Sequence, residues 1–121
     1  MHMQREQQNP HSIQAYSDTQ VMIKNIVYSH SIVVGQDFLL SPWTTHSMEA
    51  LLVDDLWVLI TQKPELIVLG SSRQSTQCPM PIRQQFIEAK IGLECMTLGA
   101  ACRTFNLLLH EQRSVLLGII F

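Results

Sequence analysis

The first candidate for chemistry is a polar cluster at the end of a short apolar run. The cluster consists of the glycine that ends the run and the two serines and the arginine that follow it. The run is ELIVLG at 65–70, and the cluster is Gly70, Ser71, Ser72 and Arg73. Loops at the carboxyl ends of parallel strands are the usual ligand sites of α/β proteins. Backbone N–H groups and an arginine are also donors that hold a phosphate or a carboxylate. The cluster is therefore a candidate anion site. The alternative is a surface loop in which Gly70 allows a tight exit from the strand.

Three polar side chains of different type share one side of the helix that we predict at 99–111. At about 100° per residue, Arg103, Asn106 and His110 fall within about 60° of one another. The other side carries apolar residues, namely Leu98, Ala101, Phe105, Leu108 and Leu109. We interpret the polar stripe as a candidate surface for a protein partner, and the alternative is a solvated helix face.

The chain offers no set of side chains with the spacing of a catalytic or metal site. Cys102 and His110 lie two helical turns apart, about 12 Å along the axis, which is too far for a nucleophile and its base. The sequence holds no HExxH, no GxSxG and no CxxC. Its three cysteines, Cys78, Cys95 and Cys102, are an odd number, which argues against a disulfide framework. We therefore predict no catalytic residue, metal or cofactor, and three free thiols in a reducing compartment.

Composition limits the class of protein that these residues belong to. Of 121 residues, 46% are hydrophobic and 15% are charged, with a net charge of −2. This composition excludes a chain that is disordered throughout, and it lacks the basic excess typical of nucleic-acid binding. The sequence shows neither the ~18-residue apolar run of a membrane span nor an apolar segment of a secretory signal. We expect a cytoplasmic monomer or weak dimer with a flexible tail at 1–12 and one domain at 13–121.

The first half of the domain is predicted to be a meander of short antiparallel strands followed by a helix. Apolar and polar residues alternate between 13 and 34, with Lys24 and Asn25 as a possible tight turn. A helix that ends before Pro64 begins either near residue 48 or near residue 53. We expect Trp57, on this helix, to pack against the core, and the alternative is a functional tryptophan on the surface.

The second half alternates strands and helices, which indicates an α/β fold of βαβαβ type. The run at 65–70 has the continuous apolar character of a central strand buried on both faces. A helix follows from Pro81, with Gly92 as the residue after its end, and strands at 93–97 and 114–121 flank the helix at 99–111. We predict that the strands at 65–70 and 93–97 are parallel. The strand at 114–121 is compatible with either direction. We expect the meander to add antiparallel strands to this sheet, which would make it mixed. The predicted core residues are Leu66, Val68, Phe86, Phe105 and Leu108.

Three segments resemble a known family of small α/β domains of unknown function, widespread in bacteria and archaea. They are PELIVLG at 64–70, IGLECM at 91–96 and AACRTFNLLLHEQR at 100–113. The family is related to a mitochondrial respiratory complex I assembly factor and to an adipogenesis-associated protein. The resemblance implies a three-layer α/β fold with a mixed central sheet and a non-enzymatic, assembly-factor-like role. The second glycine after the central strand and the aspartate before the last helix, common in the family, are absent here.

Two hypotheses on function follow, and they predict different surfaces. The first is a non-enzymatic interaction module with a protein partner, which should show a flat or apolar exposed patch. The alternative is a small-molecule or anion-binding, enzyme-like domain that uses the loop after the 65–70 strand. In that case Arg73 or Arg103 should point into a concave pocket beside Gly70.

Overall fold

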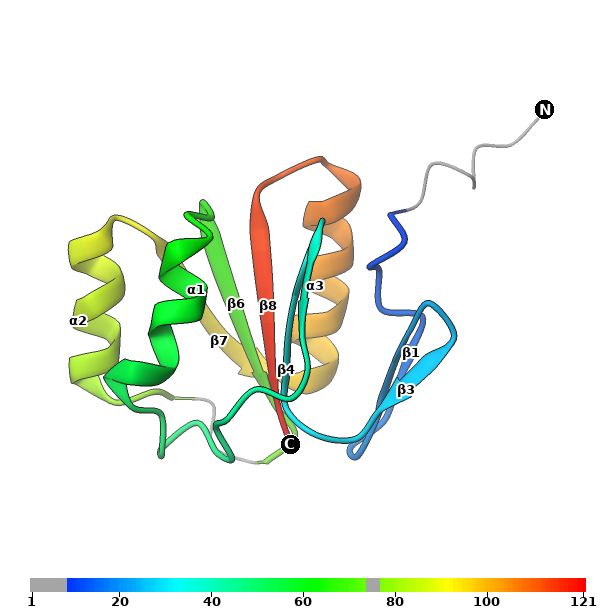
Figure 1. Cartoon of the computed structure of the whole chain (residues 1–121), viewed down its shortest axis with the longest axis horizontal. Helices are drawn as coiled ribbons and strands as arrows, with labels where there is room; N and C mark the ends of the chain where they lie inside the picture. Colours follow the sequence, from blue (N-terminus) through cyan, green and yellow to red (C-terminus); the bar gives the residue numbers. More distant parts are fainter. Residues whose placement is uncertain (1–8, 74–76) are drawn as a thin grey trace.

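A five-stranded sheet runs through the middle of the molecule, as Figure 1 shows. The computed structural model describes residues 9–73 and 77–121. The strands of this sheet are β4 (Ile32–Gly35), β5 (Phe38–Leu40), β6 (Leu66–Ser71), β7 (Gly92–Thr97) and β8 (Val115–Ile120). They are hydrogen-bonded in the order β5, β4, β8, β6, β7. β6 is parallel to both β7 and β8, whereas β4 is antiparallel to β8 and to β5. The sheet is therefore mixed, as predicted, and β6 lies inside it.

The meander divides between two sheets instead of extending one. β1 (Ala15–Tyr16), β2 (Val21–Ile23) and β3 (Ile26–Tyr28) form a separate antiparallel sheet. Lys24 and Asn25 make the tight turn between β2 and β3 with φ values of 52° and 65°, as a two-residue hairpin loop requires. The prediction that the whole meander extends the central sheet is wrong for these three strands, because only β4 and β5 pair with it.

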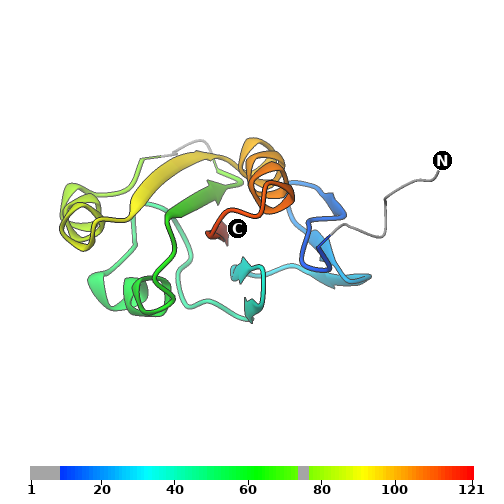
Figure 2. The same cartoon turned by 90° about the horizontal axis from the view of Figure 1, so that it is seen from above.

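Helices cover both faces of the large sheet, which gives the three layers that the resemblance implied. η2 (Val53–Leu56), α1 (Trp57–Thr61) and α2 (Met80–Ala89) lie on one face. α3 (Leu98–His110) lies on the other face, beside the small sheet (Figure 2). Each face has its own apolar core, one centred on Phe105 and Leu117, the other on Phe86 and Leu69. β8 is buried along its whole length because it is packed from both sides.

Of the two predicted starts for the helix before Pro64, the later one is correct. The Asp55 carboxylate accepts a hydrogen bond from the Leu52 N–H at 2.9 Å, which satisfies one donor at the start of η2. α1 ends at Thr61, before Pro64, as predicted. The prediction for Trp57 is wrong, since this side chain is 71% exposed, whereas Trp43 is buried. Leu56 and Leu59 are buried against the sheet. At about 100° per residue, Trp57 lies on a different side of the helix and faces solvent.

The end of α2 and the predicted core also differ in part from expectation. Lys90, not Gly92, adopts the left-handed conformation that ends the helix, with φ at 60°. Gly92 begins β7, where a Cβ atom would lie 3.0 Å from Leu66 Cδ1. Val68, Phe86 and Phe105 are buried as predicted, but Leu66 and Leu108 are half-buried at the margin of the core.

Residues 9–12, assigned to the tail from the sequence, form a turn against the large sheet. The Asn9 side chain accepts a hydrogen bond from the His11 backbone at 2.7 Å. The His11 Nδ1 donates to the Gly35 carbonyl oxygen at 2.6 Å. The rest of the predicted tail, residues 1–8, lies outside the described residues.

Candidate functional site

A hollow of about 480 Å³ lies where the end of β6, the first turn of α3 and β1 meet. We call it the α3 hollow. Both Arg73 and Arg103 line it, together with Tyr16, Ser17, Asp18, Ser71, Ser72, Thr97, Leu98, Gly99 and Ala100. The structure therefore joins one residue of the predicted partner stripe to the predicted anion loop, although the two lie 30 positions apart in sequence. This concave arrangement beside the loop is the one that the anion hypothesis expects.

Gly70 allows α3 to approach β6 closely, and this contact shapes the hollow. A Cβ atom at Gly70 would lie 2.5 Å from the Ala101 Cβ and 3.3 Å from the Leu98 Cα. Gly70 lies within β6 and has a negative φ, so it does not serve as a tight exit from the strand. Its missing side chain instead brings the start of α3 beside Ser71.

The backbone donors of the predicted anion loop are already engaged. The Ser72 N–H donates to the Ile120 carbonyl oxygen at 3.1 Å, and the Arg73 N–H donates to Ser71 Oγ at 3.1 Å. These two N–H groups therefore have partners within the chain, and anion binding by the loop stays a prediction. The first turn of α3 also lines the hollow, and the Thr97 side chain does not cap the N–H groups of that turn.

Arg103 is held above the first turn of its own helix. Its Nη1 donates a hydrogen bond to the Tyr16 hydroxyl at 2.6 Å, and Tyr16 lies 87 positions earlier in the chain. The same Nη1 would lie 3.3 Å from a Cβ atom at Gly99. The one ion pair among the described residues joins Arg113 to Glu65, at 3.4 Å, outside the hollow. Neither Arg73 nor Arg103 therefore has a carboxylate partner in the part of the chain that the structure describes.

Asn106 holds the N-terminal segment against α3. Its Oδ1 accepts from the Ile13 N–H at 2.8 Å, and its Nδ2 donates to the Ile13 carbonyl oxygen at 3.0 Å. The side chain thus satisfies both backbone groups of Ile13, in the way that a neighbouring strand would. Two of the three stripe residues, Arg103 and Asn106, accordingly have partners within this chain.

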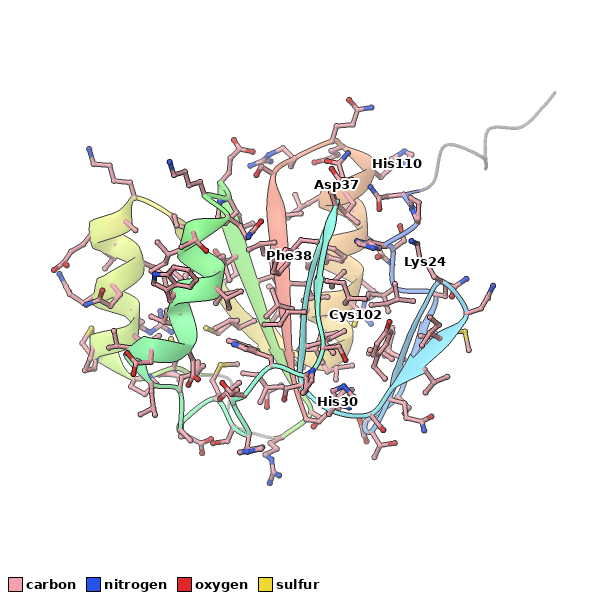
Figure 3. All side chains as sticks on the ribbon, viewed as in Figure 1. Lys24, His30, Asp37, Phe38, Cys102 and His110 are labelled. Carbon is pink, nitrogen blue, oxygen red and sulfur yellow. The ribbon has the colours of Figure 1, made fainter. Side chains whose placement is uncertain are left out.

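His110 lies at the other end of α3 and is exposed (Figure 3). It lines a second hollow of about 590 Å³ with Asn106, Leu107, Asn9, Ser12, Ile13 and Gln14. The predicted stripe is therefore divided between the two ends of the helix. Binding of a partner by the stripe stays a prediction.

Burial suppresses the reactivity of the thiols. All three cysteines are free, and the Cys78 and Cys95 sulfurs lie 3.8 Å apart. Burial, with a smaller contribution from neighbouring Cys78, raises the pKa of Cys95 to about 12. Burial also raises the pKa of Cys102 to about 12, although the Arg103 charge opposes this shift. Cys102 packs in the core of the α3 face, as the sequence indicated (Figure 3). Among the described residues, no group of three or more His, Cys, Asp or Glu side chains has the arrangement of a metal site.

The sequence analysis missed an exposed apolar surface on the α1 and α2 layer. Five large apolar side chains are exposed there, namely Leu52, Val53, Trp57, Met80 and Ile87. We call this set the α1–α2 surface. Met80 and Ile87 are seven positions apart on α2 and lie on one side of it, whereas Val53 begins η2 and Trp57 begins α1. Helical spacing of apolar residues was the only sequence signal for this surface. The same spacing is typical of a buried helix face, so it does not show that the residues are exposed.

A family model described as Protein of unknown function (DUF498/DUF598) matches residues 13–120. The chain belongs to this family. The match confirms the resemblance that the three sequence segments indicated. It covers both sheets and all the helices, so the α3 hollow and the α1–α2 surface both lie within the DUF498 domain.

Solved structures share the DUF498 fold over nearly their whole length. An NMR structure of a Xanthomonas campestris protein is 26% identical, with a TM-score of 0.81, and the match covers 97% of this chain and 89% of that one. A crystal structure of an outer membrane protein from Bartonella henselae is 23% identical, with a TM-score of 0.73, over 92% of this chain and 96% of that one. The second likeness shows the fold alone.

One curated relative of this DUF498 domain carries a membrane name. The 13 kDa major membrane protein of Francisella tularensis subsp. holarctica (strain LVS) is 31% identical over 58 residues, which are 48% of this chain and 47% of that protein. The matched region thus spans about half the length of that relative. Within residues 9–73 and 77–121, none of the helices has both the length and the apolar character that crossing a membrane requires.

Proposed function

We propose that this DUF498 domain is a non-enzymatic protein-interaction module whose partner binds the α1–α2 surface. The observation that supports the proposal is the gathering of large apolar side chains on one layer. Trp57 is 71% exposed, and Leu52 and Val53, five and four positions earlier in the chain, are exposed too. Exposed apolar patches of this kind are typical of protein-binding surfaces, and tryptophan is among the side chains that most often anchor them.

The position of η2 supports a common surface for the two helices. η2 packs against α2 in addition to leading into α1. Leu52 and Val53 at the start of η2 therefore lie next to the layer that carries Met80 and Ile87. A partner that covers Trp57 would remove apolar area from water on both helices, at roughly 25 cal/mol per Å².

The chemistry of the thiols supports binding over catalysis. A thiolate is a strong nucleophile, but burial, the largest cause at both sites, raises the pKa values of Cys95 and Cys102 to about 12. They therefore stay protonated at neutral pH. A buried thiol serves packing, which fits a module that binds a partner without covalent chemistry.

The proposal is tested by comparing the proteins that bind the chain and two of its variants in its native cell. Trp57→Ala removes the proposed anchor, and Leu107→Ala removes an apolar side chain that is 57% exposed on α3, on the opposite face of the sheet. We expect at least one protein whose capture falls about tenfold with Trp57→Ala and stays unchanged with Leu107→Ala. Both variants should melt at the temperature of the original chain. The same proteins at the same levels on all three baits would contradict the proposal.

The proposal includes a cytoplasmic location, which the three free thiols support. Two similar proteins are named membrane proteins, so location requires its own measurement. Fractionation of the native cell should recover the chain with cytoplasmic marker proteins. Recovery with the membranes, resistant to high salt, would contradict this part of the proposal.

A further inference from the structure

We propose that the α3 hollow binds a phosphate group carried on a small organic molecule, held chiefly by Arg73 and Arg103. The site lies on the face of the sheet opposite the α1–α2 surface, so this inference does not depend on the proposed protein partner. It rests on three features of the hollow: its charge, the position of Arg103 and the hydrogen-bonding character of its side chains.

The charged side chains that line the α3 hollow carry a net positive charge. Two arginines and one carboxylate, Asp18, line it. Within the described residues, Asp18 makes no ion pair with Arg73 or with Arg103. The guanidinium of Arg103 is instead fixed by a neutral partner, the Tyr16 hydroxyl, at 2.6 Å. This contact positions the guanidinium and leaves its charge available to an anion, and the planar fork of arginine suits phosphate geometry.

The Arg103 guanidinium also reaches back to the end of α3 where a positive charge is least favourable. The N-terminus of a helix carries a partial positive charge, and acidic side chains normally lie there. The first turn of α3 has no acidic residue, and Thr97 provides no side-chain cap. Tyr16 nevertheless holds Arg103 over Gly99, in this first turn. A bound anion would neutralise both the guanidinium and the helix end, so the arrangement is one that a ligand would stabilise.

A buried hydroxyl adds a donor to the hollow. Ser71 is 2% exposed and lines the hollow. Its oxygen accepts from the Arg73 N–H, and its own proton has no acceptor among the residues that the structure describes. The Tyr16 hydroxyl likewise accepts from Arg103 and retains its proton for donation. Two arginines, two hydroxyl-bearing side chains and the first turn of α3 thus line one space. This set of donors suits a phosphate because phosphate oxygens accept several hydrogen bonds.

The volume of the hollow indicates what accompanies the phosphate. At about 480 Å³ it falls within the range of small-molecule pockets, roughly 300–1,000 Å³, and exceeds the space that a bare phosphate fills. Leu98 and Ala100 supply apolar lining beside the donors. A phosphate monoester, either free in solution or as the headgroup of a lipid such as phosphatidic acid, therefore fits.

In the first test, the full chain is titrated with inorganic phosphate at constant ionic strength, and binding is monitored through the NMR signals of the backbone amides. Constant ionic strength removes non-specific charge effects. We expect saturable shifts of the Leu98, Gly99 and Ala100 amide signals. Arg103→Gln should weaken binding about tenfold or more, the loss expected for a charge-assisted hydrogen bond. Arg113→Gln, which removes an exposed arginine elsewhere, should leave the affinity within about twofold.

Arg73→Gln provides a second variant, because the Arg73 side chain makes no hydrogen bond or ion pair with the residues that the structure describes. It should also weaken phosphate binding while the melting temperature stays unchanged. Shifts that do not saturate, or equal affinities for Arg73→Gln, Arg103→Gln and the original chain, would overturn the proposal.

The second test distinguishes the two sources of the phosphate. The chain is mixed with phosphatidylcholine vesicles, with and without phosphatidic acid, and separated by flotation. Binding only to vesicles with phosphatidic acid, lost in Arg103→Gln, assigns the site to a lipid headgroup. Phosphate binding without vesicle binding assigns it to a free monoester. Failure of both overturns the inference and leaves the α1–α2 surface untouched.

Discussion

The two faces of the large sheet are both buried, but the layers that cover them differ in how they are held and in what they expose. On one face, α3 has 13 residues, five of them buried, and its polar side chains bond to the N-terminal segment. On the other face, α1 has five residues with one buried, and α1 and α2 attach through apolar packing around Phe86. The first layer bonds Arg103 and Asn106 within the chain and leaves Leu107 exposed, whereas the second leaves the five apolar side chains of the α1–α2 surface exposed.

The helices of the two layers therefore differ in the role that we assign to them. Where side-chain hydrogen bonds join distant segments, as Asn106 joins Ile13, the helix serves the fold and positions the hollow at its end. Where a short helix buries one side only, its other side remains available to a second molecule. We therefore predict that substituting buried or hydrogen-bonded side chains of α3 changes stability, and that substitutions on the α1–α2 surface change binding.

The largest expected effect concerns the two buried phenylalanines, one from each layer. Phe105→Ala and Phe86→Ala should each lower the free energy of unfolding by about 3–5 kcal/mol, because both side chains are fully buried. Denaturant unfolding of the two variants measures the loss. If Phe86→Ala lost less than about 1 kcal/mol while Phe105→Ala lost the full amount, α2 would be loosely packed and the two faces would differ in their cores too.

Asn106→Ala should lower the free energy of unfolding by about 1–3 kcal/mol. The substitution leaves both backbone groups of Ile13 without their partner in a partly buried site. Gln84→Ala, at an exposed position of α2, is the matched control and should change stability by less than about 0.5 kcal/mol. Equal effects of the two amide substitutions would show that polar bonding does not distinguish the layers.

Alkaline pH should destabilise the fold through thiols on both faces. The pKa of Cys102 is raised from 9.0 to about 12 in the folded chain, chiefly by burial. A raised pKa means that the folded state keeps the proton more strongly than the unfolded state. The contribution to stability is therefore fully present below about pH 9 and is lost as pH rises toward 12.

Urea unfolding of the original chain and of Cys102→Ala at increasing pH measures this contribution. The original chain should lose more stability than the variant over the same interval. Parallel stability-against-pH profiles of the original chain and of Cys102→Ala would contradict the prediction that Cys102 contributes to alkaline destabilisation. Cys95, whose pKa is also raised to about 12, provides the same comparison on the α2 face.

The smallest expected effect is that of Trp57→Ala on stability. We expect a change within about 0.5 kcal/mol, because the side chain is 71% exposed and contributes little to the core. Thermal unfolding of the purified variant measures it. A loss above about 1.5 kcal/mol would show that Trp57 packs in solution, and the proposed anchor would then be part of the fold.

Apolar periodicity, proline and turn residues predicted much of the fold, because these local features reflect which residues of a segment are buried and where it ends. The continuous apolar run at 65–70 indicated a strand covered on both faces, and β6 is one. Pro64 marked the end of a helix because proline removes a backbone donor, and Lys24 with Asn25 marked a hairpin. The buried state of Phe86, Phe105 and Cys102 followed from the same periodicity.

Features that depend on distant segments were not predictable in this way. Periodicity predicted that Arg103, Asn106 and His110 share one side of a helix, but not that residues 13 and 16 would bond to two of them. Nor could it show that Gly70 draws α3 against β6, or that Trp57 faces water while Trp43 fills the core. The sequence alone determined which segments become strands and helices, since backbone preference and burial act over a few neighbouring residues. Only the tertiary structure decided which side chains meet in the α3 hollow and which apolar side remains uncovered, because these depend on contacts between residues as many as 93 positions apart.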